Sequence, residues 1–148
     1  YLTEGGIRVP MIAYWPGKVK ARIVSDHICA HWDLMPTFCE LAKIPTPKHT
    51  DGISYVPTLT GGKQTKHKYL YWEFYERTFR QAVILENWKL IRSDMDNEKL
   101  QLYDLSTDIH EDTNLASQKT KVLNEMLVYM EEAHRPHPKW LTPRSQKK

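Results

Sequence analysis

Four short stretches in the second half of the chain have the length and the apolar content of β-strands. They are residues 69–75, 81–85, 88–91 and 100–104. In the first of them, Leu70, Trp72 and Phe74 alternate with polar aromatic or acidic side chains, which gives one apolar and one amphipathic face. Glu86-Asn87, between the second and third stretches, has the length of a hairpin turn, and asparagine tolerates a positive φ. The pattern predicts a four-stranded antiparallel sheet.

A helical pattern follows the strands over residues 121–133. Val122, Met126 and Met130 recur at a spacing of four, and two leucines widen the apolar stripe. Each such side chain contributes roughly 1.5–3 kcal/mol when it is fully buried. We therefore expect this helix, the longest of the chain, to pack on the sheet.

Two shorter helices are predicted in the first half of the chain. Asp33 is suited to the N-cap of the first, and Ile44-Pro45 should end it, because a residue before proline avoids the helical region. The stripe of this helix that faces the core is expected to comprise Leu34, Phe38, Leu41 and Ala42. The second helix is predicted over residues 54–59 and ends at Gly61-Gly62.

The chain opens with a turn that contains two adjacent glycines, Gly5-Gly6. Residues 11–15 follow as an apolar, uncharged run that Pro16-Gly17 ends, so a buried strand is predicted there, and residues 23–28 are a second extended candidate. Arg8 is the sole charge next to this run. If it is buried it needs a partner, for which Glu4 and Asp33 are the candidates; an exposed arginine is the alternative.

A polar and basic stretch, residues 61–68, has no apolar period. It is the predicted boundary between a first part, residues 1–62, and a second part, residues 63–148. No internal repeat is present.

Several motifs together resemble those of sulfatases. The string Glu4-Gly5-Gly6-Ile7-Arg8-Val9-Pro10, followed by Trp15-Pro16-Gly17, resembles the segment that comes after the catalytic core of these enzymes. Further stretches fit the same family in the same order. They are Asp33-Leu34-Met35-Pro36-Thr37, Asp51-Gly52-Ile53-Ser54, Trp88-Lys89 and Leu102-Tyr103-Asp104-Leu105. The resemblance extends over nearly the whole chain, to Trp140.

The resemblance implies the C-terminal portion of an arylsulfatase-like, formylglycine-dependent sulfuric ester hydrolase that uses Ca²⁺. The implied fold class is α+β: residues 1–62 would hold the last strand and helices of an alkaline-phosphatase-like α/β core, and residues 63–148 a four-stranded antiparallel sheet with a packed C-terminal helix. The implied partners are the upstream catalytic domain and a sulfated carbohydrate substrate. The parent enzyme is expected to be periplasmic or secreted.

The composition is that of a globular chain, with 41% hydrophobic and 11% aromatic residues among 148. No run of about 18 apolar residues occurs, so no membrane-spanning helix is expected. A net charge of +3 is too small to indicate nucleic-acid binding. Cys29 and Cys39 are expected to be buried free thiols. A chain that begins with Tyr1 and has no signal peptide is expected to be a piece of a longer one.

The catalytic residues of sulfatases are not found in this sequence. The family's formylglycine is made from a Cys/Ser-x-Pro-x-Arg motif, and no cysteine or serine here begins one. Asp26-His27 looks like the family's metal-binding pair, but it follows the Gly-Gly turn instead of preceding it, so we interpret it as structural or exposed. His134 and His137 fit a polar helix exit better than a metal site. We predict no catalytic and no metal-binding residue in this chain.

Four residues are candidates for substrate binding: Tyr75, Arg77 and Arg80 after the first strand, and His134 after the long helix. Guanidinium forks suit sulfate oxygens, and a tyrosine face suits a sugar ring. Because the resemblance places this subdomain beside the active-site cleft, we predict a substrate-contacting rim. An exposed hairpin tip with solvated charges is the alternative. A carbohydrate-binding module and a structural interaction module, both without enzymatic activity, are the alternatives for the whole chain.

Overall fold

The computed structural model describes residues 1–76, 78–93, 99–140 and 142, which form two compact units. The first unit combines residues 1–9 with the described residues from 68 onward, and the second comprises residues 10–67. Along the chain, the second unit is therefore inserted between two parts of the first. Residues 1–9, which the sequence grouped with residues 10–62, belong to the sheet unit. That residues 1–62 supply the core of a larger enzyme stays a prediction.

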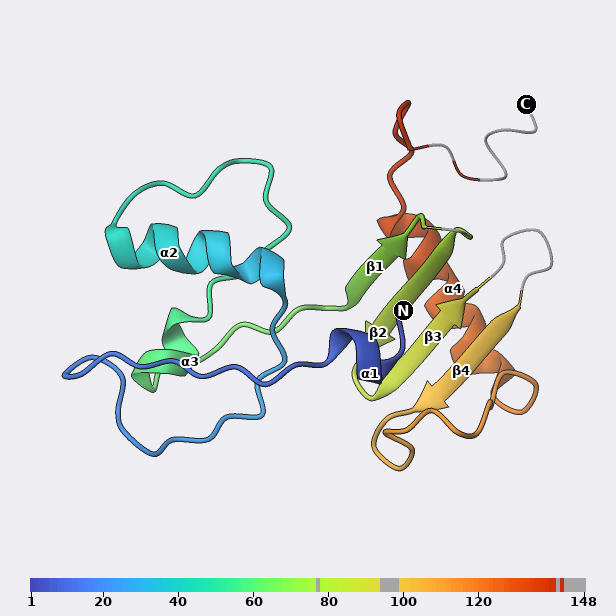
Figure 1. The fold of residues 1–148 in the computed structure, drawn as a ribbon, viewed down its shortest axis with the longest axis horizontal. Coiled ribbons are helices and arrows are strands. Elements are labelled where there is room, and N and C mark those ends of the chain that lie inside the picture. The colour runs from blue at the N-terminus through green and yellow to red at the C-terminus, as the bar shows by residue number, and fades with distance from the viewer. Residues whose placement is uncertain (77, 94–98, 141, 143–148) are drawn as a thin grey trace. The chain divides into compact units, whose positions relative to one another are not determined.

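The first unit contains an antiparallel sheet with the strand order β1-β2-β3-β4 (Figure 1). The strands are β1 (Leu70–Phe74), β2 (Arg80–Leu85), β3 (Trp88–Arg92) and β4 (Leu100–Asp104). All four predicted strands are confirmed. In the turn between β2 and β3 the positive φ, 53°, falls on Glu86.

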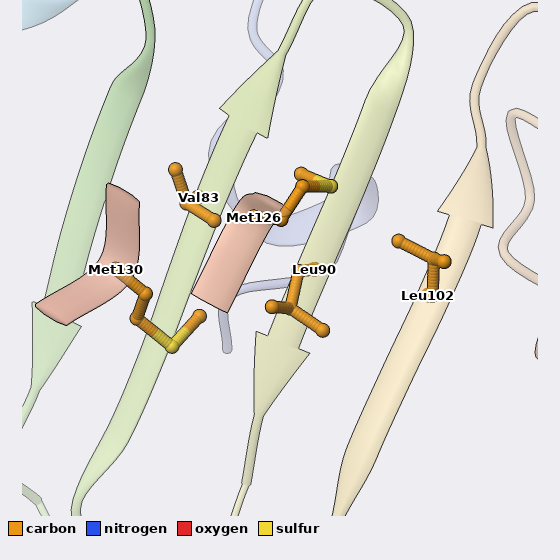
Figure 2. Close-up of a cluster of buried hydrophobic side chains, with 5 residues drawn as sticks. All are labelled: Val83, Leu90, Leu102, Met126 and Met130. Atoms are coloured by element: carbon orange, nitrogen blue, oxygen red, sulfur yellow. The ribbon is translucent and has the colours of Figure 1, made fainter. Parts of the chain in front are cut away.

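Helix α4 (Thr120–Ala133) packs along one face of this sheet, as its apolar spacing predicts (Figure 1). Met126 and Met130 are completely buried against Val83, Leu90 and Leu102, one residue from each of β2, β3 and β4 (Figure 2). The three strand residues share a face because Val83 lies opposite Leu90, and Leu90 opposite Leu102, in the register of the sheet. Replacing either methionine by a smaller residue would open a cavity at the centre of this contact.

The opposite face of the sheet is covered by the start of the chain. Leu2 packs there with Ala82, Ile91 and Tyr103, and helix α1 (Glu4–Ile7) follows it directly. Gly6 in this helix has no room for a side chain, because a Cβ atom would come 2.3 Å from the carbonyl oxygen of Tyr1. The sheet is therefore buried on both faces.

A buried ion cluster lies between α1 and the sheet. The ammonium of Lys89, on β3, lies 2.7 Å from Oε1 of Glu4 and 2.8 Å from Oε1 of Glu111, and the Lys89 side chain has no exposed surface. Oε2 of Glu111 also accepts a hydrogen bond from the backbone N–H of Glu4, at 2.9 Å. Arg8 pairs with Glu4 at 3.8 Å, so the predicted partner is confirmed. The Arg8 side chain is nevertheless 67% exposed, which is the alternative of an exposed arginine and not a buried pair.

The second unit contains the short 3₁₀ helix η1 (His31–Asp33) and helices α2 (Leu34–Ala42) and α3 (Val56–Thr60). Both predicted α-helices are present. The C-cap of α2 is Lys43, with a φ of 57°, and that of α3 is Gly61, with a φ of 83°. None of the described helices is long and apolar enough to cross a membrane.

The predicted apolar stripe of α2 is wrong. Pro36, Thr37 and Cys39 are the buried residues of this helix, whereas Phe38 is 59% exposed. Hydrogen bonds of Thr37 explain this orientation of the helix. The hydroxyl of Thr37 donates to the carbonyl oxygen of Asp33 at 2.6 Å and accepts from the backbone N–H of Tyr55 at 3.1 Å. These bonds turn the Thr37 side of the helix toward the segment that follows residue 52.

The buried strand predicted at residues 11–15 is also wrong, and residues 23–28, the second extended candidate, form no strand either. Neither is a strand, and Ile12 and Tyr14 are 93% and 88% exposed. A strand is stabilised by hydrogen bonds to a neighbour, and within the described part of the chain no segment pairs with either stretch. Cys39 is buried and Cys29 is partly buried, and both are free thiols, as the sequence predicted.

Candidate functional site

Polar and aromatic side chains gather where β1 ends and α4 ends, within the first unit. Glu73, on β1, is the centre of this group: its Oε2 accepts a hydrogen bond from the hydroxyl of Tyr75 at 2.7 Å. Its Oε1 lies against the hydroxyl of Tyr71 and against Nδ1 of His134, the residue that follows α4. One carboxylate thus connects the first strand to the end of the last helix.

The electrostatics of this group follow from burial and hydrogen bonding. Burial raises the pKa of the Glu73 carboxyl, but the hydrogen bonds with His134, Tyr71 and Tyr75 outweigh burial and leave the pKa below its ordinary value. Burial and the bond to Glu73 raise the pKa of Tyr75 to about 12. The same two causes raise the pKa of Tyr71 further. At neutral pH the tyrosines are therefore neutral donors to an ionised Glu73.

An aromatic cluster continues from Tyr75. Its ring centroid lies 4.8 Å from that of Phe79 and 5.4 Å from that of Trp140, and Phe79 lies 6.1 Å from the ring of His134. Phe79 is buried, with 6% of its surface exposed, whereas Trp140 is 58% exposed. Phe79 therefore anchors the aromatic cluster in the protein interior, and Trp140 is its solvent-exposed end.

The structure brings two of the four predicted substrate-binding residues together. Tyr75 and His134 meet at Glu73, which occupies the Tyr75 hydroxyl and Nδ1 of His134. Arg80 lies elsewhere: it is directly opposite Phe74 in the sheet register, on the face that packs against Leu2, and its guanidinium carbon lies 5.3 Å from the ring centroid of Tyr1. Arg77 lies outside the described residues.

Sequence reasoning missed Glu73 and Trp140 as members of this group. Glu73 was assigned only to the amphipathic face of β1, and its spacing of two from both Tyr71 and Tyr75 is the signal that places all three on one side of the strand. Trp140 follows two prolines in a polar segment, and an apolar residue without a periodic pattern around it gives no sign of a tertiary contact.

The second unit contains a different polar centre, at Asp33, whose surface is 1% exposed. The predicted N-cap role of its carboxylate is wrong, because no cap hydrogen bond to α2 forms. Instead Oδ2 accepts from the backbone N–H of Ala30 at 2.7 Å, and Oδ1 lies 2.8 Å from both the N–H of Ile53 and Nε2 of His67. These partners use the oxygens that an N-cap would offer, so Asp33 joins three segments of the unit.

Beside this centre the second unit has an open hollow of about 410 Å³. Its polar lining residues are Ser25, Asp26, His27, Thr58, Gln64 and Lys66. Burial lowers the pKa of His27, which keeps its imidazole neutral at pH 7. Asp26 and His27 thus line a surface hollow. Their interpretation as structural or exposed residues, and not as metal ligands, stays a prediction.

The residues that the structure describes provide no site for the metal that the resemblance to sulfatases implies. Among residues 1–76, 78–93, 99–140 and 142, no group of three or more His, Cys, Asp or Glu side chains could hold a metal ion. The sequence contains no Cys/Ser-x-Pro-x-Arg motif from which formylglycine is made. We therefore assign no step of a sulfatase reaction to a metal or a formylglycine held by this chain.

Comparison with known proteins identifies the chain's relatives. Residues 1–135 match the family described as N-sulphoglucosamine sulphohydrolase, C-terminal. The chain is 34% identical over 140 residues to an uncharacterized sulfatase of Schizosaccharomyces pombe, an alignment that covers 87% of this chain and 25% of that protein. It is 29% identical over 143 residues to N-acetylgalactosamine-6-O-sulfatase of Bacteroides thetaiotaomicron, covering 86% of this chain and 27% of the relative.

Solved structures agree with these relatives. The chain has a TM-score of 0.70 and 25% identity to a protein solved in complex with its substrate D-glucosamine-2-N,6-O-disulfate, with coverage of 80% of this chain and 26% of that one. The predicted α+β fold class is confirmed. This chain spans 25% of the S. pombe sulfatase and 27% of the B. thetaiotaomicron enzyme. A match over residues 1–135 to a sulfatase C-terminal family establishes that the chain belongs to the sulfatases, as a portion of their C-terminal region.

Proposed function

We propose that this chain is the non-catalytic C-terminal portion of an enzyme that hydrolyses sulfate esters of saccharides. The family match over residues 1–135 is the observation that carries the proposal. A structural neighbour at a TM-score of 0.70 has the sulfated sugar D-glucosamine-2-N,6-O-disulfate as its substrate, which supports a saccharide over other sulfate esters. Under this proposal the nucleophile and its activating groups belong to a catalytic domain N-terminal to residue 1.

The same proposal assigns Ca²⁺ and formylglycine to that catalytic domain. In that domain a formylglycine would supply the nucleophile for sulfate-ester cleavage, and Ca²⁺ would stabilise negative charge on the sulfate oxygens. This chain's own contribution is to support and border the site. Residues 1–62 are assigned to the catalytic core and residues 63–148 to a subdomain with the sheet and α4.

The substrate rim is assigned to the end of the sheet where Tyr75 and His134 meet. Glu73 binds the hydroxyl of Tyr75 and Nδ1 of His134, so these two atoms are not available to a substrate, and the proposed role of both residues is to shape the rim. Arg77 keeps its proposed role as a sulfate-binding guanidinium. For Arg80, a rim role requires the substrate to reach the opposite face of the sheet, where its guanidinium lies over Tyr1.

The experiment compares the protein that carries its N-terminal catalytic domain with residues 1–148 alone. Sulfate release is measured by ion chromatography from 4-nitrophenyl sulfate and from a chondroitin 6-sulfate tetrasaccharide. We expect release by the longer protein, loss of that release with EDTA, and none by residues 1–148. A longer protein with confirmed formylglycine that releases sulfate from neither substrate would contradict the proposal, and so would turnover by residues 1–148.

The alternative of a carbohydrate-binding module makes a different prediction for the same samples. Such a module would bind the tetrasaccharide without its N-terminal neighbour and would have no dependence on formylglycine. Saccharide binding by a longer protein that releases no sulfate would favour this alternative.

A further inference from the structure

Trp140 is an exposed aromatic residue held in a fixed place. It closes a tight turn after α4, in which its backbone N–H donates to the carbonyl oxygen of His137 at 3.0 Å. The backbone N–H of Lys139 donates to Nδ1 of the same histidine at 3.2 Å. Tryptophan is usually well buried in folded proteins, yet 58% of this residue is exposed. The exposed part of the indole is therefore open to a ligand.

The turn that carries Trp140 is fastened at two points. His134, at its start, lies against the carboxylate of Glu73, and the indole ring of Trp140, at its end, lies 5.4 Å from the ring of Tyr75. Tyr75 is itself held by Phe79 on one side and by its hydroxyl bond to Glu73. Because the indole is already positioned, a ligand that binds it loses little additional conformational entropy.

The segment that carries the indole is basic. Residues 134–140 have the sequence His-Arg-Pro-His-Pro-Lys-Trp, which contains no acidic side chain. Lys139, next to Trp140, is exposed. An exposed aromatic residue that follows an exposed lysine matches a ligand whose ring presents C–H groups and whose substituents are anionic, and a sulfated or uronic-acid-containing sugar has both features.

We propose that Trp140 stacks on a sugar ring next to the sulfated unit that is hydrolysed, and that Lys139 pairs with an anionic substituent of that ring. Tyr75, Glu73 and His134 are positioning residues in this site, because they hold Trp140 and its turn and because Glu73 occupies the Tyr75 hydroxyl and Nδ1 of His134. The inference rests on the proposed sulfatase function and adds a binding subsite to it. It also predicts that the indole and Lys139 contact oligosaccharides and not small aryl sulfates.

The first experiment measures kcat and KM of the protein with its catalytic domain for the chondroitin 6-sulfate tetrasaccharide and for 4-nitrophenyl sulfate. Trp140→Ala should raise KM for the tetrasaccharide about tenfold, an effect of the size that loss of one aromatic stacking contact has on the binding of a nucleic-acid base. Trp140→Phe, which keeps a ring, should stay within about threefold of the unmodified protein. KM for 4-nitrophenyl sulfate should not change. Val128→Ala, which removes an exposed apolar side chain on α4, is the matched control and should alter neither substrate.

The second experiment tests the positioning residues. Tyr75→Phe keeps the ring and should leave KM for the tetrasaccharide nearly unchanged, whereas Tyr75→Ala should raise it. If Tyr75 acts through Trp140, adding Tyr75→Ala to Trp140→Ala should raise KM little further, because both changes remove the same contact. A full additive effect of the two substitutions would reject the positioning role.

Binding measured without turnover separates this inference from the proposed function. Addition of the tetrasaccharide should quench tryptophan fluorescence of the unmodified protein, and Trp140→Phe should abolish most of that quench. A quench that Trp140→Phe leaves intact, or equal rises in KM for both substrates in Trp140→Ala, would overturn the subsite; the latter result would indicate that Trp140 packs against the catalytic domain. Sulfate release from the tetrasaccharide by the unmodified protein is the independent readout of the proposed function.

Discussion

The ammonium of Lys89 lies 2.7 Å from a carboxylate oxygen of Glu4, a residue 85 positions earlier in the chain. Glu111, 107 positions after Glu4, is the second carboxylate of the cluster and comes after Lys89 in the sequence. A fully buried ammonium is stable only with such partners, since desolvation of an unpaired charge is costly. The cluster therefore fixes the first turn of the chain on the sheet.

Lys89→Met tests this cluster. The variant keeps the apolar length of the side chain but leaves Glu4 and Glu111, whose side chains are 10% and 5% exposed, next to each other without a cation. We expect a loss of about 3–5 kcal/mol in the free energy of unfolding, measured by urea denaturation at pH 7. Lys89→Arg is the charge-preserving control and should lose less. A Lys89→Met variant as stable as the unmodified protein would contradict the role of the cluster.

Arg8 provides the contrast, because it pairs with the same Glu4 carboxylate from the surface. Its distance of 3.8 Å and its 67% exposed side chain describe a solvated ion pair. Arg8→Ala should change the free energy of unfolding by less than about 0.5 kcal/mol, since exposed pairs are weak and are screened by salt. The same urea experiment measures it. A loss as large as that of Lys89→Met would mean that Arg8 is buried in the protein in solution.

The lowered pKa of Glu73 predicts a pH-dependent stability. Burial alone would raise the pKa, but the hydrogen bonds from His134, Tyr71 and Tyr75 bring it below the ordinary value of 4.5. The native state therefore binds fewer protons than the unfolded state, so the stabilisation is complete above pH 4.5 and is lost as the pH falls through the lower pKa of the folded protein.

The corresponding measurement is urea unfolding of Glu73→Gln and of the unmodified protein, from pH 5.5 down to pH 3. The unmodified protein should be the more stable at pH 5.5, and the difference should shrink toward pH 3. Glu132→Gln, at an exposed position of α4, is the control and should show a difference that does not vary with pH. A Glu73→Gln difference that grows as the pH falls would reject the sign of the shift.

Local patterns predicted the sheet unit because its elements bury apolar residues that repeat along the sequence. The spacing of Met126 and Met130 and the alternation in β1 required no knowledge of distant partners. The same reasoning failed at residues 11–15, which have the composition of a strand but no neighbour to pair with among the described residues. It also failed for α2, whose orientation depends on a hydrogen bond that the backbone N–H of Tyr55, 18 residues away, donates to the hydroxyl of Thr37.

The candidate site could be predicted only in part, for the same physical reason. Tyr75 and His134 were identified from their chemistry, but what brings them together is Glu73, and the bond between Glu73 and His134 spans 61 residues. Arg80 was grouped with Tyr75 by its nearness in sequence. Side chains alternate between the two faces of a strand, and the hairpin places Arg80 opposite Phe74. Arg80 and Tyr75 are therefore close in sequence but lie on different faces of the sheet.

Two of the motifs that resemble those of sulfatases contact each other in the second unit, and Asp33 makes this contact. Its carboxylate accepts the N–H of Ile53, from the Asp51-Gly52-Ile53-Ser54 motif, at 2.8 Å. Next to this bond Gly52 packs so closely on Trp32 that a Cβ atom would lie 2.1 Å from its carbonyl oxygen. Two motifs separated in sequence are therefore two sides of one buried joint.

Asp33→Ala should destabilise the second unit by about 3–5 kcal/mol, because it leaves the N–H groups of Ala30 and Ile53 and the ring of His67 without their common acceptor. His67→Gln removes only one of the three bonds and should cost about 1 kcal/mol. Tryptophan fluorescence during urea unfolding measures both, since Trp32 adjoins the joint. If His67→Gln cost as much as Asp33→Ala, the imidazole and not the backbone joint would be the main source of stability. If Asp33→Ala cost less than about 1 kcal/mol, the buried joint itself would be rejected.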